Sequence, residues 1–179
     1  MGNIKLMMLL HETLNEIGDL QNITPYEYKK INNLNYIFSA NINGEKTNVK
    51  VWFDNIENAI PLLKVNSQIY NNNLKKYYQD GVYNMGFSVN KKTSQYDKTN
   101  LREYFPILKT ISNIAFEFIN NRDPFAITVF GEDKKGTGGI DPQKTLLYFK
   151  LLSSNLPKKY RLDNIEYLSK KNGYVIYKN

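Results

Sequence analysis

The stretch that decides the fold is LNYIFSANINGEKTNVKVWF, residues 34–53. Asn43-Gly44 at its centre is the dipeptide most typical of a two-residue type I′ turn, because that turn needs positive φ at both positions. Folding the chain about this turn pairs Leu34 with Phe53, Tyr36 with Val51, Phe38 with Val49, and Ala40 with Thr47. All four pairs suit a buried face, so the stretch predicts an antiparallel hairpin that turns one face to the core.

The opposite face of this hairpin is polar, as a solvated face should be: it carries Asn35, Ser39, Asn41, Asn48 and Lys50. Ile37 and Trp52 break the pattern, and the predicted register makes them near-diagonal neighbours. A partner protein is one explanation for these two side chains, and another element of the same chain that covers them is the favoured one.

Two further stretches have clear periodicity. Residues 82–90 alternate between an apolar face and a small polar face, which predicts a strand whose polar face allows another backbone to come close. Residues 99–121 repeat apolar side chains at intervals of three and four, which predicts the main helix, capped by Thr99 or Asn100. Pro106 conflicts with a continuous helix, because it removes a backbone donor, so the helix is expected to restart or kink there.

The C-terminal part predicts a strand at 127–130, a polar glycine-rich loop at 131–140, and a helix at 142–155 that begins with Asp141-Pro142. Two strands follow, at about 160–168 and 173–178, with a turn at Lys170–Gly173 that contains a second Asn-Gly dipeptide. The N-terminal part predicts a helix at 3–20, with one apolar stripe and Gly18 at its end. Residues 54–82 lack clean periodicity and read as an irregular arm, with a short helix at about 66–79.

These elements predict a single α+β domain over residues 1–179. We expect a mainly antiparallel sheet of about six strands, two helices packed on one face of it, and the N-terminal helix in addition. Neither an internal repeat nor a linker rich in proline, glycine or serine divides the chain.

Composition excludes several kinds of chemistry. The chain has 179 residues, no cysteine and one histidine, so disulfide scaffolds and cysteine-based metal or redox sites are excluded. No apolar run reaches about 18 residues, so we expect no membrane association. The net charge of +7 comes mostly from lysine, and three arginines are few for a protein that reads DNA bases.

Motif searches give near misses. Gly131–Thr137 approaches a phosphate-binding loop but lacks the lysine after Gly136, and His11-Glu12 opens a zinc-protease pattern whose second histidine position holds Asn15. We therefore predict no catalytic residue, no metal site and no cofactor.

Five short stretches form a further pattern: they are Tyr83–Val89, Tyr96–Leu101, Leu108–Ile111, Phe130-Gly131 and Gly173–Ile176. Together these stretches resemble small proteins of tailed bacteriophages, and most closely the neck and tail-barrel ring proteins of crAss-like phages. They cover about residues 83–178, and they are structural motifs rather than catalytic ones. The resemblance implies a virion component, assembled in the host cytoplasm, that forms a ring with copies of itself and contacts other portal, neck or tail proteins.

The resulting expectation is a non-enzymatic ring or adaptor subunit that acts by assembly, with only incidental contact to DNA. The expected contact segments are the first helix, the arm at 54–82 and the loop at 131–141, each well ordered only in the assembly. The candidate interface residues are Leu6, Met7, Leu10, Ile37, Trp52, Tyr77, Tyr78, Lys134 and Lys135. The alternatives are a small nucleic-acid-binding protein of a phage and an enzyme of unrecognised type.

Overall fold

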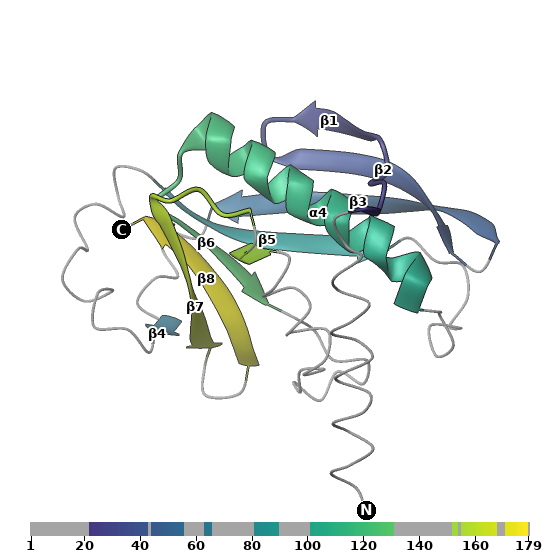
Figure 1. Ribbon diagram of the computed structural model, residues 1–179. Helices are drawn as coiled ribbons and strands as arrows, with labels where there is room; N and C mark the ends of the chain where they lie inside the picture. The colour runs from purple at the N-terminus through teal and green to yellow at the C-terminus, as the bar shows by residue number, and fades with distance from the viewer. Residues whose placement is uncertain are drawn as a thin grey trace, which may run out of the picture.

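A computed structural model describes residues 22–42, 44–55, 63–65, 81–89, 101–130, 152–153, 155–167 and 171–178. Within these ranges the chain forms one twisted sheet and one long helix that crosses a face of it (Figure 1). The elements are β1 (Tyr28–Asn32), β2 (Asn35–Ile42), β3 (Glu45–Asn55), β4 (Leu63–Val65), β5 (Val82–Val89), α4 (Leu101–Arg122), β6 (Ala126–Phe130), β7 (Tyr160–Tyr167) and β8 (Lys171–Lys178).

The eight strands lie in the order β1-β2-β3-β5-β6-β8-β7-β4. Among these described strands every neighbouring pair is antiparallel except β5 and β6, which are parallel. The predicted mainly antiparallel α+β sheet is therefore confirmed, but six strands were too few. The two additional strands, β1 and β4, form the edges of the sheet. An edge strand with exposed side chains has little hydrophobic alternation, and three residues are too short for a periodic pattern.

The central hairpin has the predicted register. Tyr36 pairs with Val51, Phe38 with Val49 and Ala40 with Thr47, and the Phe53 N–H donates to the Leu34 carbonyl at 2.9 Å. Gly44 has a φ of 78°, the left-handed conformation that the turn requires. The apolar side chains of β2 and β3 are fully buried on the face under α4. Local turn chemistry and burial pattern thus specify the same pairing.

Helix α4 packs its apolar stripe on this inner face. The ring of Phe118 stacks on that of Phe53, with 3.8 Å between centroids, and meets the ring of Tyr83 edge-on at 5.0 Å. The helix begins at Leu101 and includes Pro106, so the expectation that it starts again at the proline is wrong. The Thr110 hydroxyl donates to the Pro106 carbonyl at 2.6 Å. No described helix has the length and apolar character needed to cross a bilayer.

The C-terminal hairpin forms, but its turn differs from the prediction. Tyr167 pairs with Lys171, so residues 168–170 connect the strands, and Asn172 and Gly173 pair with Glu166 and Ile165 inside the ladder. An Asn-Gly dipeptide permits a turn without compelling one. The register instead follows burial, since Leu162 lies opposite Ile176, which belongs to the core.

The remaining predicted elements lie wholly or partly outside the described residues. These are the helices at 3–20 and 66–79, the loop at 131–140 and most of the helix at 142–155. Of that last helix, Leu152 and Ser153 are helical, and Leu152 is buried in the core. The structure therefore describes only one of the two predicted sheet-packing helices in full, namely α4. The arm at 54–82 is partly regular, because β3 extends to Asn55 and Leu63–Val65 forms the edge strand β4.

Candidate functional site

The sheet face opposite α4, here called the outer face, carries the two described residues that the sequence singled out. Ile37 lies opposite Lys50 on β3 and Lys29 on β1, and Trp52 lies opposite Asn35 on β2 and Gly86 on β5. Both apolar side chains are half-buried. The structure therefore places Ile37 and Trp52 as diagonal neighbours on one surface.

Trp52 lies directly against the backbone of β5. A Cβ atom built on Gly86 would come within 2.5 Å of the indole Cε2 and Cζ2 atoms, a distance that real contacts do not reach. Glycine is therefore the residue that lets the indole lie flat on the neighbouring strand. The small polar face predicted for β5 does receive a close neighbour, and that neighbour is a side chain rather than another backbone.

The outer face divides into an exposed end and a buried end. At the exposed end, Lys46, Asn48 and Lys50 alternate along β3, and the Ser39 hydroxyl donates to the Asn48 side-chain oxygen at 3.0 Å. At the other end, toward β6 and β8, Thr128 is fully buried, and its hydroxyl lies 3.2 Å from the Asn84 side-chain oxygen. The solvent-accessible part of the face therefore combines lysine, amide side chains and the Ile37–Trp52 pair.

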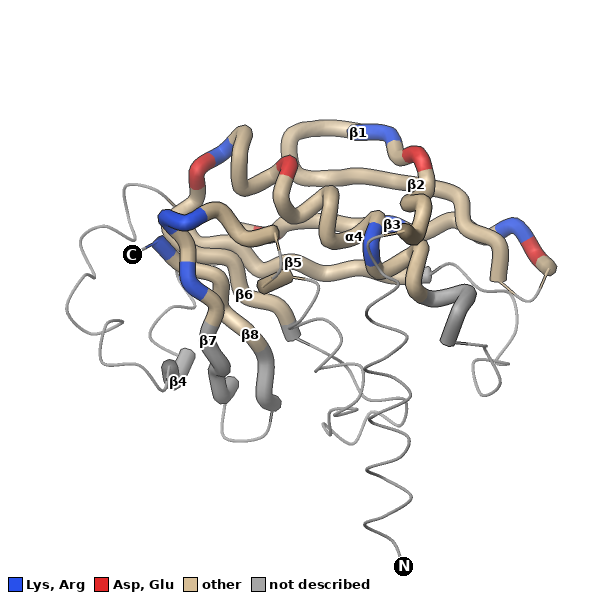
Figure 2. Tube along the Cα trace, in the orientation of Figure 1, with Lys and Arg blue, Asp and Glu red and all other residues tan. Residues whose placement is uncertain are grey.

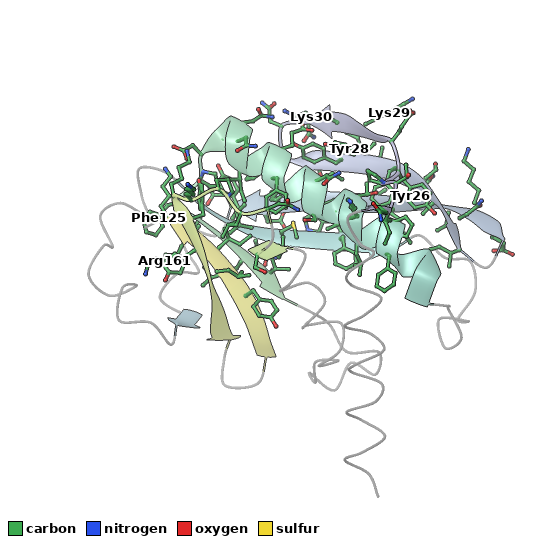
Figure 3. All side chains as sticks on the ribbon, in the orientation of Figure 1. Tyr26, Tyr28, Lys29, Lys30, Phe125 and Arg161 are labelled. Atoms are coloured by element: carbon green, nitrogen blue, oxygen red, sulfur yellow. The ribbon has the colours of Figure 1, made fainter. Side chains whose placement is uncertain are left out.

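The edge strand β1 is a second exposed feature. Lys29, Lys30, Ile31 and Asn32 are all exposed, and Ile31, at 60%, is the one large hydrophobic side chain among the described residues that is exposed. Figure 2 shows the lysines of β1 at the upper rim of the sheet, and Figure 3 shows both side chains projecting outward from it. No other strand lies beyond β1 in the described part of the sheet.

Two tyrosines fasten this edge to α4. The Tyr28 hydroxyl donates to the Glu117 carboxylate at 2.7 Å, and the Tyr26 N–H donates to the Thr110 hydroxyl at 2.8 Å. The Tyr28 ring meets the Tyr36 ring edge-on, with 6.1 Å between centroids. The two hydrogen bonds join residues more than 80 positions apart in the chain. No local pattern in the sequence predicts these hydrogen bonds.

The electrostatic environment keeps the Tyr28 phenol protonated. Burial raises its pKa above the usual value, and the hydrogen bond to Glu117 and the charge of that carboxylate raise it further. The same causes raise the pKa of Tyr36, with burial first. Tyr28 therefore remains a hydrogen-bond donor over the physiological pH range.

Asp123 anchors the C-terminal end of α4 to the C-terminal hairpin. Its carboxylate forms ion pairs with Lys159 Nζ at 2.8 Å and Lys178 Nζ at 3.1 Å, and it accepts a hydrogen bond from the Tyr160 hydroxyl at 3.0 Å. Its φ of 49° is left-handed, which ends the helix. The hydrogen bond from Lys159 is the main reason that the Asp123 pKa falls to about 2; burial opposes this effect, and Lys178 and Tyr160 lower the pKa further. The arrangement fits a structural link between helix and hairpin.

The other predicted interface residues lie outside the described part of the chain: they are Leu6, Met7, Leu10, Tyr77, Tyr78, Lys134 and Lys135. Within the described ranges, no three histidine, aspartate or glutamate side chains gather where they could hold a metal ion.

The outer face and the β1 edge are thus the two surfaces on which the described residues support a function. No protein-family model matches the chain, and no curated protein or solved structure matches it either.

Proposed function

We propose that this chain is a structural virion protein of a tailed bacteriophage. It serves as a ring or adaptor subunit of the neck or tail and acts by assembling with copies of itself and with other portal, neck or tail proteins. The observation that carries the proposal is the Ile37–Trp52 pair, two large apolar side chains side by side on an otherwise polar, lysine-bearing face.

Large apolar side chains on a polar surface commonly contribute most of the binding free energy of a protein interface. Tryptophan is enriched at the centres of protein interfaces, where polar neighbours form a rim that excludes water. Trp52 is held flat on Gly86, so it can be buried by a partner with little further loss of side-chain freedom. The stacked rings of Phe53 and Phe118 directly behind the sheet support this surface from the inner face.

The experiment is the particle mass of the purified full chain, measured by mass photometry, alone and mixed with portal, neck and tail proteins of the same virion. We expect a multimer, or a mixed complex, whose formation shifts the fluorescence of Trp52 to shorter wavelength. Trp52 is the single tryptophan of the chain, so the signal has one source.

Matched variants test whether the outer face makes the contact. Ile37→Lys places a charge within the apolar pair and is expected to weaken assembly at least about tenfold. Asn41→Lys adds the same charge on the same face of β2, at an exposed position away from Trp52, and should leave assembly intact. A single-chain mass under all conditions, or equal loss in both variants, would contradict the proposal.

A small nucleic-acid-binding protein is the second candidate, favoured by one observation. Lys29, Lys46 and Lys50 lie on the outer face with Trp52, which combines cations for phosphates with a ring for a base. A filter-binding titration with single-stranded DNA tests it. Three phosphate contacts predict a slope of about −2 for log affinity against log salt concentration. A slope near zero would exclude this candidate.

A further inference from the structure

The open edge of β1 has a defined set of outward-facing backbone groups. The Phe53 N–H donates to the Leu34 carbonyl, so the even-numbered residues of β2 direct their backbone groups to β3, and the odd-numbered ones face β1. Lys29 pairs with Ile37, so its N–H and C=O face β2. The backbone N–H and C=O groups of Tyr28 and Lys30 therefore point away from the sheet, and within the described part of the chain nothing pairs with them.

This edge is held in position before any partner arrives. The Tyr28 hydroxyl donates a hydrogen bond to Glu117 of α4, and the backbone N–H of Tyr26, just before the strand, donates one to Thr110 of the same helix. The Tyr26 ring stacks on Phe38 of β2, with 5.9 Å between centroids. Because these contacts order the strand in advance, adding another strand to it costs less conformational entropy than pairing with a loose segment.

The side chains of β1 favour one sign of charge in a strand that pairs with its open edge. Lys29 and Lys30 are exposed on opposite faces of the strand, β1 itself contains no acidic residue, and one exposed acidic residue, Glu27, directly precedes it. The nearby Glu117 carboxylate is occupied by the Tyr28 hydroxyl. An antiparallel β1–β1 contact between two copies, centred on Lys29 or Lys30, would bring lysines close to lysines, which is unfavourable across a strand pair. An acidic strand would instead receive a cation on each of its faces.

From this geometry we infer that β1 is a docking edge for an extended acidic segment of a partner protein, which adds beside β1 as a further strand of the sheet. Main-chain hydrogen bonds to Tyr28 and Lys30 would supply the pairing, and Lys29 and Lys30 the preference for acidic side chains. Exposed Ile31 offers an apolar contact at one end. This inference goes beyond the proposed ring subunit, because it concerns the open edge of β1, which shares only Lys29 with the outer face, and it does not require a ring.

The test uses the full chain, labelled with nitrogen-15, and a capped peptide of roughly eight residues built from valine, threonine and two adjacent glutamates. We expect the amide exchange of Tyr28 and Lys30 to slow on binding. The amide of Lys29, which already faces β2, should change little. Protection of neither Tyr28 nor Lys30 at millimolar peptide would overturn the inference.

Two pairs of variants separate backbone pairing from charge. Lys30→Gln and Lys30→Pro both remove the charge, but only the proline removes the outward N–H, so only the proline should abolish binding. Reversing both charges, with Lys29→Glu and Lys30→Glu, should weaken the acidic peptide about tenfold and favour a lysine version of it. A far-ultraviolet circular dichroism spectrum confirms that each variant keeps the sheet.

Three results would overturn the inference: equal binding by Lys30→Pro and Lys30→Gln, equal binding of acidic and basic peptides, or a dimer of the wild type that Lys30→Pro dissociates. The last result would make a second copy of the chain the occupant of the edge. The first two results leave the Ile37→Lys experiment unaffected, so the inference and the proposed function can fail separately.

Discussion

Replacing Asp123 with asparagine removes the carboxylate charge at the end of α4 and leaves the backbone turn in place. Asparagine adopts the left-handed conformation readily, so the φ of 49° adds no strain in this variant. The side chain keeps one oxygen that can accept from the Tyr160 hydroxyl. The change therefore isolates the ionic attraction to Lys159 and Lys178.

The size of the effect follows from the pKa. The Asp123 pKa falls from 3.8 to about 2, chiefly because of the hydrogen bond from Lys159, and each unit corresponds to 1.36 kcal/mol, which gives an upper limit of about 2.4 kcal/mol. The side chain of Asp123 is 52% exposed and that of Lys159 58%, so solvent screens much of this attraction. We expect Asp123→Asn to lower the free energy of unfolding by about 1 kcal/mol, or the melting temperature by about 2–4 °C.

The assay is thermal unfolding of wild type and Asp123→Asn from pH 7 to pH 2 at constant ionic strength. A carboxylate with a lowered pKa in the folded state stabilises the protein above the pKa of the unfolded chain. The difference between the two proteins should thus be constant above about pH 5 and disappear as pH falls from about 4 to about 2.

Asp54→Asn is the matched control. Asp54 is exposed on β3, and its side chain has no hydrogen bond or ion pair with the described residues, so Asp54→Asn should leave the melting temperature unchanged. The reasoning is refuted if Asp123→Asn is as stable as wild type at pH 7, or if the difference persists undiminished at pH 2.

Three other changes test the packing of the sheet. Tyr28→Phe removes the hydrogen bond to Glu117 and should cost about 1 kcal/mol in urea unfolding. Because the Tyr28 pKa is raised in the folded state, wild type should lose stability as pH rises above 10, where the unfolded phenol ionises, and Tyr28→Phe should lose less. Gly86→Ala forces a methyl group into the indole of Trp52 and should cost about 1–3 kcal/mol, with a red-shifted tryptophan emission as the readout. Thr128→Val keeps the shape of a fully buried side chain but removes its hydroxyl, and should cost about 1 kcal/mol in the same unfolding assay.

The sequence predicted elements in which a local signal and a burial pattern agree. The hairpin of β2 and β3 has both, since the turn at Gly44 and the alternation from Tyr36 to Phe53 specify one register. Helix α4 was predicted from its apolar spacing, although Pro106 opposed it. The strand β1 was not predicted, because Tyr28 holds it against α4, a helix far along the chain, and no local pattern indicates that contact.

The candidate site was predictable only in part. Ile37 and Trp52 stood out because they broke a polar alternation, and the predicted register made them neighbours. The contact of Trp52 with Gly86 depends on the order of strands in the sheet, which no local pattern of β3 or β5 specifies. A glycine inside a strand was nevertheless a signal that something comes close. The role of Asp123 could not be predicted from the sequence, because it depends on where the fold places Lys159 and Lys178, which lie much later in the chain.

The parallel contact between β5 and β6 divides the sheet into two halves. One half is β1-β2-β3-β5, the other is β6-β8-β7-β4, and all pairs within each half are antiparallel. Four ladder pairs, from Val82–Ala126 to Met85–Val129, join the halves in parallel, and the chain crosses this boundary from β3 to β4, from β4 to β5, and through α4 from β5 to β6. Parallel pairing is slow to form because the intervening chain must first be ordered. The junction of β5 and β6 is therefore the place in the sheet where we expect pairing to be completed last, after the antiparallel strands on each side of it have formed.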